Sequence, residues 1–216
     1  MSQREYFLSS GKFLYLKIDV DYKNILHEAI NLKNRFVPHR SKSYLHNGWQ
    51  SICLHGVSET HIDTWGEYGF KSAEDAGNAS KWTTVSSECP FTMDFLLNKF
   101  PSTRYARVRF ETVKSKGSIN GYSSRIPCIE TISVLLNKPA GYSIIWDDGD
   151  ELECTAGSVI AINNHYPYTV TNNSNEDQYN LVISRHDSTN EWKSLMNQAC
   201  IAQNITGEYI LHDIAS

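Results

Sequence analysis

The sequence predicts an α+β protein that is mainly β, with an all-β carboxy-terminal half folded as an antiparallel sandwich or a small barrel. After Pro101, six short runs rich in β-branched and aromatic residues follow one another, separated by clusters of Gly, Pro, Asn and Asp. No long helical pattern interrupts these runs, which argues against the alternating strands and helices of a parallel sheet. With 216 residues, the chain is long enough to bury one core.

The first hundred residues predict two strands and two helices. Residues 13–20, FLYLKIDV, alternate as a strand does, and residues 22–38 have the period of a helix that a proline ends. Residues 48–57 are strand-like, and a polar, irregular segment extends from 58 to 80. A second helix is expected over 89–101, with a proline near its start. The apolar side of this helix would consist of Phe91, Phe95, Leu96 and Phe100.

The carboxy-terminal half predicts six strands and then a short helix over 188–203. We expect one structural domain in three parts. Residues 1–100 would pack on the barrel, 101–187 would form its core, and 188–216 would be a helix and tail. The six predicted strands are 105–113, 129–137, 142–148, 150–163, 166–173 and 178–186.

Charge and hydropathy patterns exclude several function classes. The 20 basic and 24 acidic residues give a net charge of −4, without the basic stripe that nucleic acid or an anionic membrane requires. No apolar run approaches the roughly 18 residues of a membrane span, and the first residues show no signal peptide. The five cysteines form no Cys-x-x-Cys pair, as expected of reduced thiols. We therefore expect a cytoplasmic protein that binds neither nucleic acid nor membranes.

Two stretches of the carboxy-terminal half carry a family resemblance. The first, RVRFETVKSKGSI, is a strand pattern that ends in a glycine turn, and the second, GSVIAINNHYPYTVTNNSNEDQYNLVIS, contains three further strands. With the region upstream, over residues 47–186, they resemble the aspartyl/asparaginyl β-hydroxylase-like branch of the iron- and 2-oxoglutarate-dependent oxygenases. The resemblance implies a double-stranded β-helix, which is a jelly-roll, cupin-like barrel, with flanking amino-terminal helices and a short carboxy-terminal helix.

In that family two histidines and one aspartate bind Fe(II), and an arginine pairs with the distal carboxylate of 2-oxoglutarate. The resemblance places Tyr122 at the first histidine position, because two residues separate it from the preceding Gly-Ser-Ile. It places Ser124 at the aspartate position and Tyr168 at the second histidine position. Gln178 stands at the arginine position, so all four functional residues are replaced.

These replacements remove the chemistry that the four family positions supply. A phenol, with a pKa near 10, is a poor substitute for an imidazole as a ligand to Fe(II). Serine lacks the negative charge of aspartate, and glutamine cannot neutralise a carboxylate. The resemblance therefore implies a non-catalytic protein that uses the fold as a binding, regulatory or structural subunit. We expect no cofactor, neither Fe(II) nor 2-oxoglutarate, and we expect a protein partner or self-assembly.

Two other functions stay open. One is an Fe(II)/2-oxoglutarate-dependent hydroxylase of an aspartate, asparagine or related residue that uses replacement ligands. These would come from a local His-x-Asp pair, His61 and Asp63, or from His165. Short motif matches are frequent by chance, and polar loop residues explain these three positions more simply. The other is a sugar- or nucleotide-binding cupin-like module, which would show a deep open pocket without a metal.

Overall fold

The computed structural model describes residues 11–39, 46–60, 65–123, 131–185 and 189–205 of the chain. Seven strands form a large antiparallel sheet in the order β1-β8-β6-β10-β5-β3-β2, and β4 pairs with β3. Strand β9 pairs with the far end of β5, and β7 pairs with β9. The strands are β1 (Phe13–Leu16), β2 (Val37–Pro38), β3 (His46–Gly56), β4 (Lys81–Trp82), β5 (Tyr105–Tyr122), β6 (Thr131–Leu135), β7 (Tyr142–Trp146), β8 (Val159–Ile162), β9 (Tyr168–Asn172) and β10 (Gln178–Arg185).

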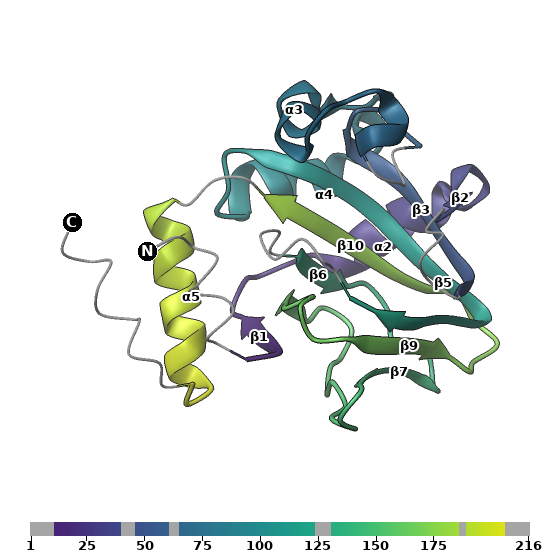
Figure 1. Cartoon of the computed structure of the whole chain (residues 1–216), viewed down its shortest axis with the longest axis vertical. Coiled ribbons are helices and arrows are strands. Elements are labelled where there is room, and N and C mark those ends of the chain that lie inside the picture. The colour runs from purple at the N-terminus through teal and green to yellow at the C-terminus, as the bar shows by residue number, and fades with distance from the viewer. Residues whose placement is uncertain (1–10, 40–45, 61–64, 124–130, 186–188, 206–216) are drawn as a thin grey trace.

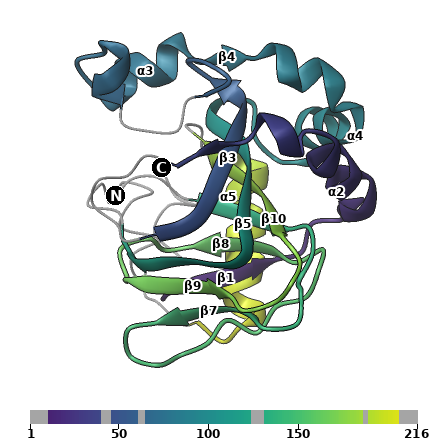
Figure 2. The ribbon, with the colours of Figure 1, turned by 90° about the vertical axis from the view of Figure 1, so that its right-hand side faces the viewer.

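The helices are short and lie on one side of the large sheet and at its ends (Figures 1 and 2). Helix α4 continues directly into the π-helical turn η4, so the two form one helix around a π-turn. The helical elements are α2 (Tyr22–Asn31), η1 (Lys33–Arg35), η2 (Trp65–Tyr68), α3 (Ala73–Ala79), η3 (Thr84–Glu88), α4 (Pro90–Asp94), η4 (Phe95–Lys99) and α5 (Asn190–Ala202).

The large sheet separates two hydrophobic cores. The first core joins the sheet to α2, η4 and α5, and includes Ile25, Phe95 and Trp192. The second core lies between the large sheet and the small β7–β9 sheet, which Figures 1 and 2 show at the end of the molecule away from α3 and α4. Two antiparallel sheets packed face to face in this way form the double-stranded β-helix, or jelly-roll, that the sequence predicts. The predicted fold class is therefore confirmed.

Strand β5 belongs to both sheets because it bends sharply near its middle. Residues 105–113 pair with β10, residues 108–119 pair with β3 on the other side, and residues 117–122 pair with β9. At the bend, Lys116 has a left-handed φ of 59°. A Cβ on Gly117 would lie 2.7 Å from the carbonyl oxygens of Asn47 and Lys114, so only glycine fits there. The predicted glycine turn at the end of the strand is therefore wrong, since the strand continues through Gly117 to Tyr122.

Helix α2 supplies the cap for α4. The buried carboxylate of Glu28 accepts hydrogen bonds from the backbone N–H groups of Phe91, at 2.7 Å, and Thr92, at 2.9 Å. It also accepts the hydroxyl proton of Thr92 at 2.5 Å. The first N–H groups of a helix have no partner within the helix, and a negative charge there is favourable. This contact explains how α4 begins and why α2 and α4 pack together.

Several details of the amino-terminal half differ from the sequence prediction. The first strand ends at Leu16, and the supposedly irregular segment contains η2 and α3. The sequence contained a signal for α3, since Ser72 is followed by an acidic residue, Asp75, three positions later. In the structure the Ser72 hydroxyl accepts a hydrogen bond from the N–H of Asp75 and so caps the helix. The side chain of Phe91 is 48% exposed, so it does not belong to the apolar side of its helix.

The carboxy-terminal helix was predicted correctly, and its end protects the edge of the large sheet. The side chain of Gln203 accepts a hydrogen bond from the N–H of Tyr15, at 3.1 Å, and donates one to the carbonyl of Tyr15, at 3.2 Å. These are the bonds that another strand would make, so the edge at β1 is partly covered. None of the described helices has the length and apolar character needed to cross a membrane. The division into 1–100, 101–187 and 188–216 stays a prediction.

Candidate functional site

A small cavity of about 50 Å³ lies inside the second core, between the two sheets. Aromatic and aliphatic side chains such as Trp49 and Val170 form most of its walls, and they come from β3, β5, β7, β8 and β9. Strands β6 and β10 contribute polar groups such as Ser133 and Asn180. Since one water needs roughly 10–15 Å³ by this measure, the cavity has room for a few water-sized groups. A buried space with both apolar walls and convergent polar groups is typical of a binding site.

Tyr122 and Tyr168 lie opposite each other on the wall of this cavity. They are partners in the pairing of β5 with β9, and their ring centroids are 5.4 Å apart. Trp49 packs edge-on against Tyr122, with centroids 5.5 Å apart. The hydroxyl of buried Tyr168 donates to Oδ1 of Asn164 at 3.2 Å, and Nδ2 of Asn164 donates to Oγ1 of Thr131 at 2.7 Å. The structure thus brings together the two tyrosines that stand at the family's histidine positions.

The phenols in this cavity are held in the protonated state. Burial raises the pKa of Tyr168 well above its usual value, and the neighbouring Tyr122 and Glu111 shift it in the same direction. Burial also raises the pKa of Tyr142, and a hydrogen bond with Asn180 opposes this only in part. Both groups therefore act as neutral hydrogen-bonding phenols at neutral pH.

The most polar feature of the cavity is a buried pair of charges, Arg109 and Glu111. Both residues lie on β5, with Arg109 4% exposed and Glu111 9% exposed. Nε of Arg109 donates to Oε1 of Glu111 in a close ion pair. Nη1 of Arg109 is buried and finds no hydrogen-bond partner among the described residues. Burial tends to lower the pKa of Arg109, but the attraction of Glu111 outweighs this, so the pKa is raised.

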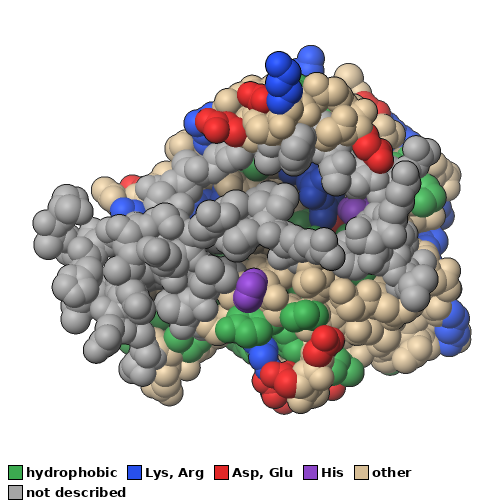
Figure 3. Space-filling model, in the orientation of Figure 1, with side chains coloured by type: hydrophobic (Ala, Val, Ile, Leu, Met, Phe, Trp, Pro, Cys, Tyr) green, Lys and Arg blue, Asp and Glu red, His purple; other side chains and the backbone are tan. Residues whose placement is uncertain are grey.

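A second arginine lies beside this pair on the same strand. Arg107 is two residues before Arg109, so both side chains leave β5 on the same side. Burial lowers the pKa of Arg107 to about 10, and repulsion from Arg109 acts in the same direction. Figure 3 shows Lys or Arg and His side chains at the floor of a hollow in one face of the molecule.

Sequence reasoning did not identify Arg109 and Glu111 as site residues. The stretch RVRFE carries charges at every second position of an apolar strand, which was the available signal. Such alternation usually indicates a face in contact with water. Here the face is covered by the small sheet, because β9 pairs with the far end of the same strand.

The other predicted positions lie elsewhere. Gln178 is fully buried at the start of β10, where its Nε2 donates to the carbonyl of Tyr179 and to Oδ1 of Asn180, each at 2.8 Å. It does not line the cavity, although its partner Asn180 does. His165 is exposed in the turn between β8 and β9, with its ring edge-on to Tyr166. Ser124, His61 and Asp63 lie outside the described residues.

The described residues of the cavity do not fit an iron site of the family type. No three His, Cys, Asp or Glu side chains in the described part of the chain come together as metal ligands would. Glu111 is the one carboxylate that the described lining contributes, and it is already paired with Arg109. An Fe(II) site of this type needs two imidazoles and a free carboxylate on one face of the metal. The donors present here are phenols, hydroxyls and amides.

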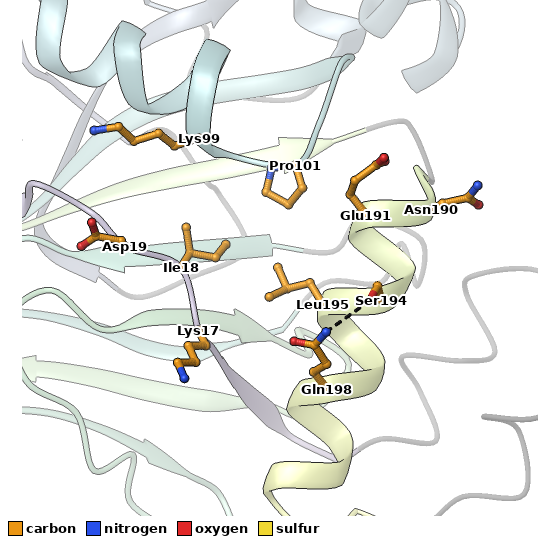
Figure 4. Close-up of a pocket in the computed structure, with 10 residues that line it drawn as sticks. All are labelled: Lys17, Ile18, Asp19, Lys99, Pro101, Asn190, Glu191, Ser194, Leu195 and Gln198. Atoms are coloured by element: carbon orange, nitrogen blue, oxygen red, sulfur yellow. Dashed lines mark hydrogen bonds between the residues drawn. The ribbon is translucent and has the colours of Figure 1, made fainter.

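A second hollow, of about 760 Å³, is a groove between the residues after β1, the end of η4 and helix α5 (Figure 4). Its charged residues, such as Lys17 and Glu191, are exposed. The one hydrogen bond drawn between its lining residues runs from Nε2 of Gln198 to Oγ of Ser194, at 3.3 Å. Exposed charges are solvated and bind little by themselves. The smaller cavity, with its buried charges, is therefore the candidate site.

Comparisons with known proteins give similarity to solved structures alone, since no family model matches and no curated protein matches. A prolyl-4-hydroxylase from Pseudomonas putida is 12% identical with a TM-score of 0.46, covering 84% of this chain and 96% of that one. OsALKBH1 is 13% identical with a TM-score of 0.47, covering 81% and 97%. An oxidoreductase of the 2OG-Fe(II) oxygenase family from Burkholderia pseudomallei is 13% identical with a TM-score of 0.47, covering 76% and 80%. The similarity to these proteins is one of fold.

Proposed function

We propose that this protein is a non-catalytic double-stranded β-helix protein that acts by binding, with the cavity between its two sheets as the site. In this proposal it serves a protein partner or a self-assembly as a binding, regulatory or structural subunit. The oxygenase-like barrel is kept as a rigid frame, and its interior holds hydrogen-bonding and charged side chains instead of metal ligands.

The contact between Tyr122 and Tyr168 carries this proposal. The family resemblance assigns their positions to the two histidines of an iron site, and the rings lie 5.4 Å apart. Burial raises the pKa of Tyr168, which favours the neutral phenol over the phenolate that binds metals well. The hydroxyl of Tyr168 is already engaged with Asn164. These two side chains support a packed, hydrogen-bonded interior.

The size of the cavity argues against a sugar- or nucleotide-binding module. Pockets for such ligands typically measure about 300–1,000 Å³. The cavity of about 50 Å³ is several times smaller, so a hexose or a nucleotide could not enter without moving β7 and β9. The ligand that we propose for the cavity is therefore much smaller than a hexose or a nucleotide.

Calorimetric titration of metal-stripped protein with Fe(II) and 2-oxoglutarate together, under anaerobic conditions, tests the proposal. We expect no heat of binding and no succinate release when air is admitted. Binding tighter than about 10 μM, or about −7 kcal/mol, followed by succinate release, would overturn the proposal. The protein would then be a hydroxylase with replacement ligands.

A variant with both His61→Asn and Asp63→Asn provides the matched control for that outcome. If the wild-type protein bound Fe(II) and this variant did not, the local His-x-Asp pair would supply the ligands. His165→Asn would test the remaining candidate in the same way. Because His165 is exposed, its replacement is not expected to affect folding.

A further inference from the structure

The buried guanidinium of Arg109 has more hydrogen-bonding capacity than the protein satisfies. An arginine carries five N–H donors, and Glu111 accepts from Nε. Arg109 lines the cavity, and its Nη1 is buried and has no partner among the described residues. A buried polar group that stays unpaired costs roughly 1–3 kcal/mol, and more when it is charged. An unpaired donor on a residue that lines a cavity is the group to which a ligand oxygen would bind.

The charges on the inner side of β5 do not cancel, although Arg107 is not itself among the residues that line the cavity. Arg107 and Arg109 project from the same side of β5, and Glu111 is the one carboxylate on that side of the strand. Arg107 and Arg109 repel each other, which contributes to the lowered pKa of Arg107. Two positive charges and one negative charge leave an excess of one positive charge. A single negative charge on a ligand would restore neutrality and relieve this repulsion.

The space available limits the ligand to a few atoms. A cavity of about 50 Å³ accommodates roughly three to five water-sized groups. Formate and acetate have this size, and their planar carboxylate matches the donor geometry of a guanidinium. Thr131, Ser133 and Asn180 also line the cavity and offer further hydrogen bonds. The walls at Val113, Ile144 and Val170 would surround the methyl group of acetate.

We propose that the cavity between the two sheets is a binding site for a small monocarboxylate of the size of formate or acetate, held by Arg109. This inference deepens the proposed function, on which it rests, by naming the class of ligand. The carboxylate would accept from Nη1, and Glu111 would fix the guanidinium by holding Nε. Glu111 is thus a positioning residue that also weakens binding through its own negative charge.

Titration of acetate and formate into metal-free protein, in the presence of a chelator and at constant ionic strength, tests the inference. Calorimetry reports binding directly, and the intrinsic fluorescence of the five tryptophans includes that of Trp49, which lines the cavity. We expect saturable binding of acetate, and a rise in the melting temperature that follows the logarithm of its concentration. Chloride provides the anion control, since it has no planar pair of oxygens.

Three variants make the result specific. Arg109→Met combined with Glu111→Leu removes both charges and should fold, because well-packed apolar residues often replace a buried ion pair at no loss of stability. This double variant should lose acetate binding. Glu111→Gln should bind acetate about tenfold more tightly, because the competing carboxylate is gone. Arg35→Met removes an exposed arginine that pairs with Glu59 and Glu88 and should bind as the wild-type protein does.

The outcomes separate this inference from the proposed function. Saturable acetate binding that the folded double variant loses supports the inference. The inference is overturned if neither acetate nor formate shows saturable binding up to about 100 mM. In that case the melting temperature would not rise with either ligand. Binding that the double variant retains also overturns the inference. In both cases the proposed non-catalytic function stands, because the titration with Fe(II) and 2-oxoglutarate decides it independently.

Discussion

The two faces of the large sheet have opposite characters, although the same strands build both. Strand β5 directs Val108 and Phe110 toward the helices, where both are fully buried in the first core. The residues between and after them, Arg109 and Glu111, project into the space between the sheets. One face is closed by apolar packing, and the other encloses charges, phenols and amides. The apolar packing and the proposed binding site therefore lie on opposite sides of one strand.

This difference allows the contributions of the two faces to folding and to the proposed binding to be tested separately. An ion pair buried at this depth contributes little to stability compared with apolar residues of the same volume. On the helix-covered face the buried charged groups lie beside the apolar core: Glu28 caps α4, and the guanidinium of Arg185 lies over the ring of Trp192. Variants on the two faces should therefore separate folding from the proposed binding.

The largest effect is expected for Phe110→Ala on the helix-covered face. Phe110 is fully buried, so its truncation should lower the free energy of unfolding by about 4 kcal/mol. Urea unfolding monitored by fluorescence measures this loss. Acetate binding by the folded fraction should stay unchanged. Phe91→Ala, at an exposed position, is the control and should cost less than about 1 kcal/mol.

A smaller loss is expected for Glu111→Gln on the inner face. This variant leaves the charge of Arg109 buried without its partner and should lower the free energy of unfolding by about 3 kcal/mol. The double variant Arg109→Met/Glu111→Leu should lie within about 1 kcal/mol of the wild-type protein. If the double variant were less stable than Glu111→Gln, the inner face would be built for stability and the contrast between the faces would fail.

Loss of the cap between α2 and α4 should have an intermediate effect. Glu28→Gln keeps the shape of the side chain but weakens charge-assisted hydrogen bonds to the N–H groups of Phe91 and Thr92. We expect the free energy of unfolding to fall by about 2 kcal/mol. Glu191→Gln, an exposed residue in the first turn of α5, is the matched control. An equal loss in both variants would contradict the assigned cap.

The mildest effect concerns alkaline pH and the buried phenols. The pKa of Tyr168 is raised in the folded protein, so its contribution to stability is complete below the unfolded pKa near 10 and is lost as the pH rises above it. Over that range the free energy of unfolding of the wild-type protein should fall by about 1.4 kcal/mol per pH unit more than that of the Tyr168→Phe variant. Urea unfolding at pH 8, 10 and 11 gives the dependence of the free energy of unfolding on pH for both proteins. Equal dependence in the two proteins would show that burial does not raise the pKa of Tyr168.

The sequence predicted the fold better than it predicted the site. Alternation along the strands and the turn residues gave the antiparallel barrel and helix α5 correctly. The same alternation placed Arg109 and Glu111 on one face of β5, but it could not show that a second sheet covers this face. That information depends on the bend at Gly117, where a long-range contact with Asn47 determines the backbone. Tyr122 and Tyr168 were recognised because local motifs fix their positions.

Ser72 shows a different kind of omission. Its hydroxyl caps α3, and the spacing to Asp75 was visible in the sequence, yet the polar composition of residues 58–80 favoured an irregular segment. A short, exposed helix buries little apolar surface, so hydrophobic periodicity does not reveal it. Caps are then the more informative evidence.

The pairing of β1 with β8 has a consequence for biosynthesis. The carbonyl of Gly11 accepts from Nδ2 of Asn163, at a sequence separation of 152 residues. At translation rates of about 5–20 residues per second, the amino-terminal strand leaves the ribosome on the order of ten seconds before its partner exists. Contacts of such long range also slow the folding of an isolated chain. Strand β1 is therefore synthesised well before β8 and is among the last strands to find its place, and its apolar residues must stay free of aggregation during that interval.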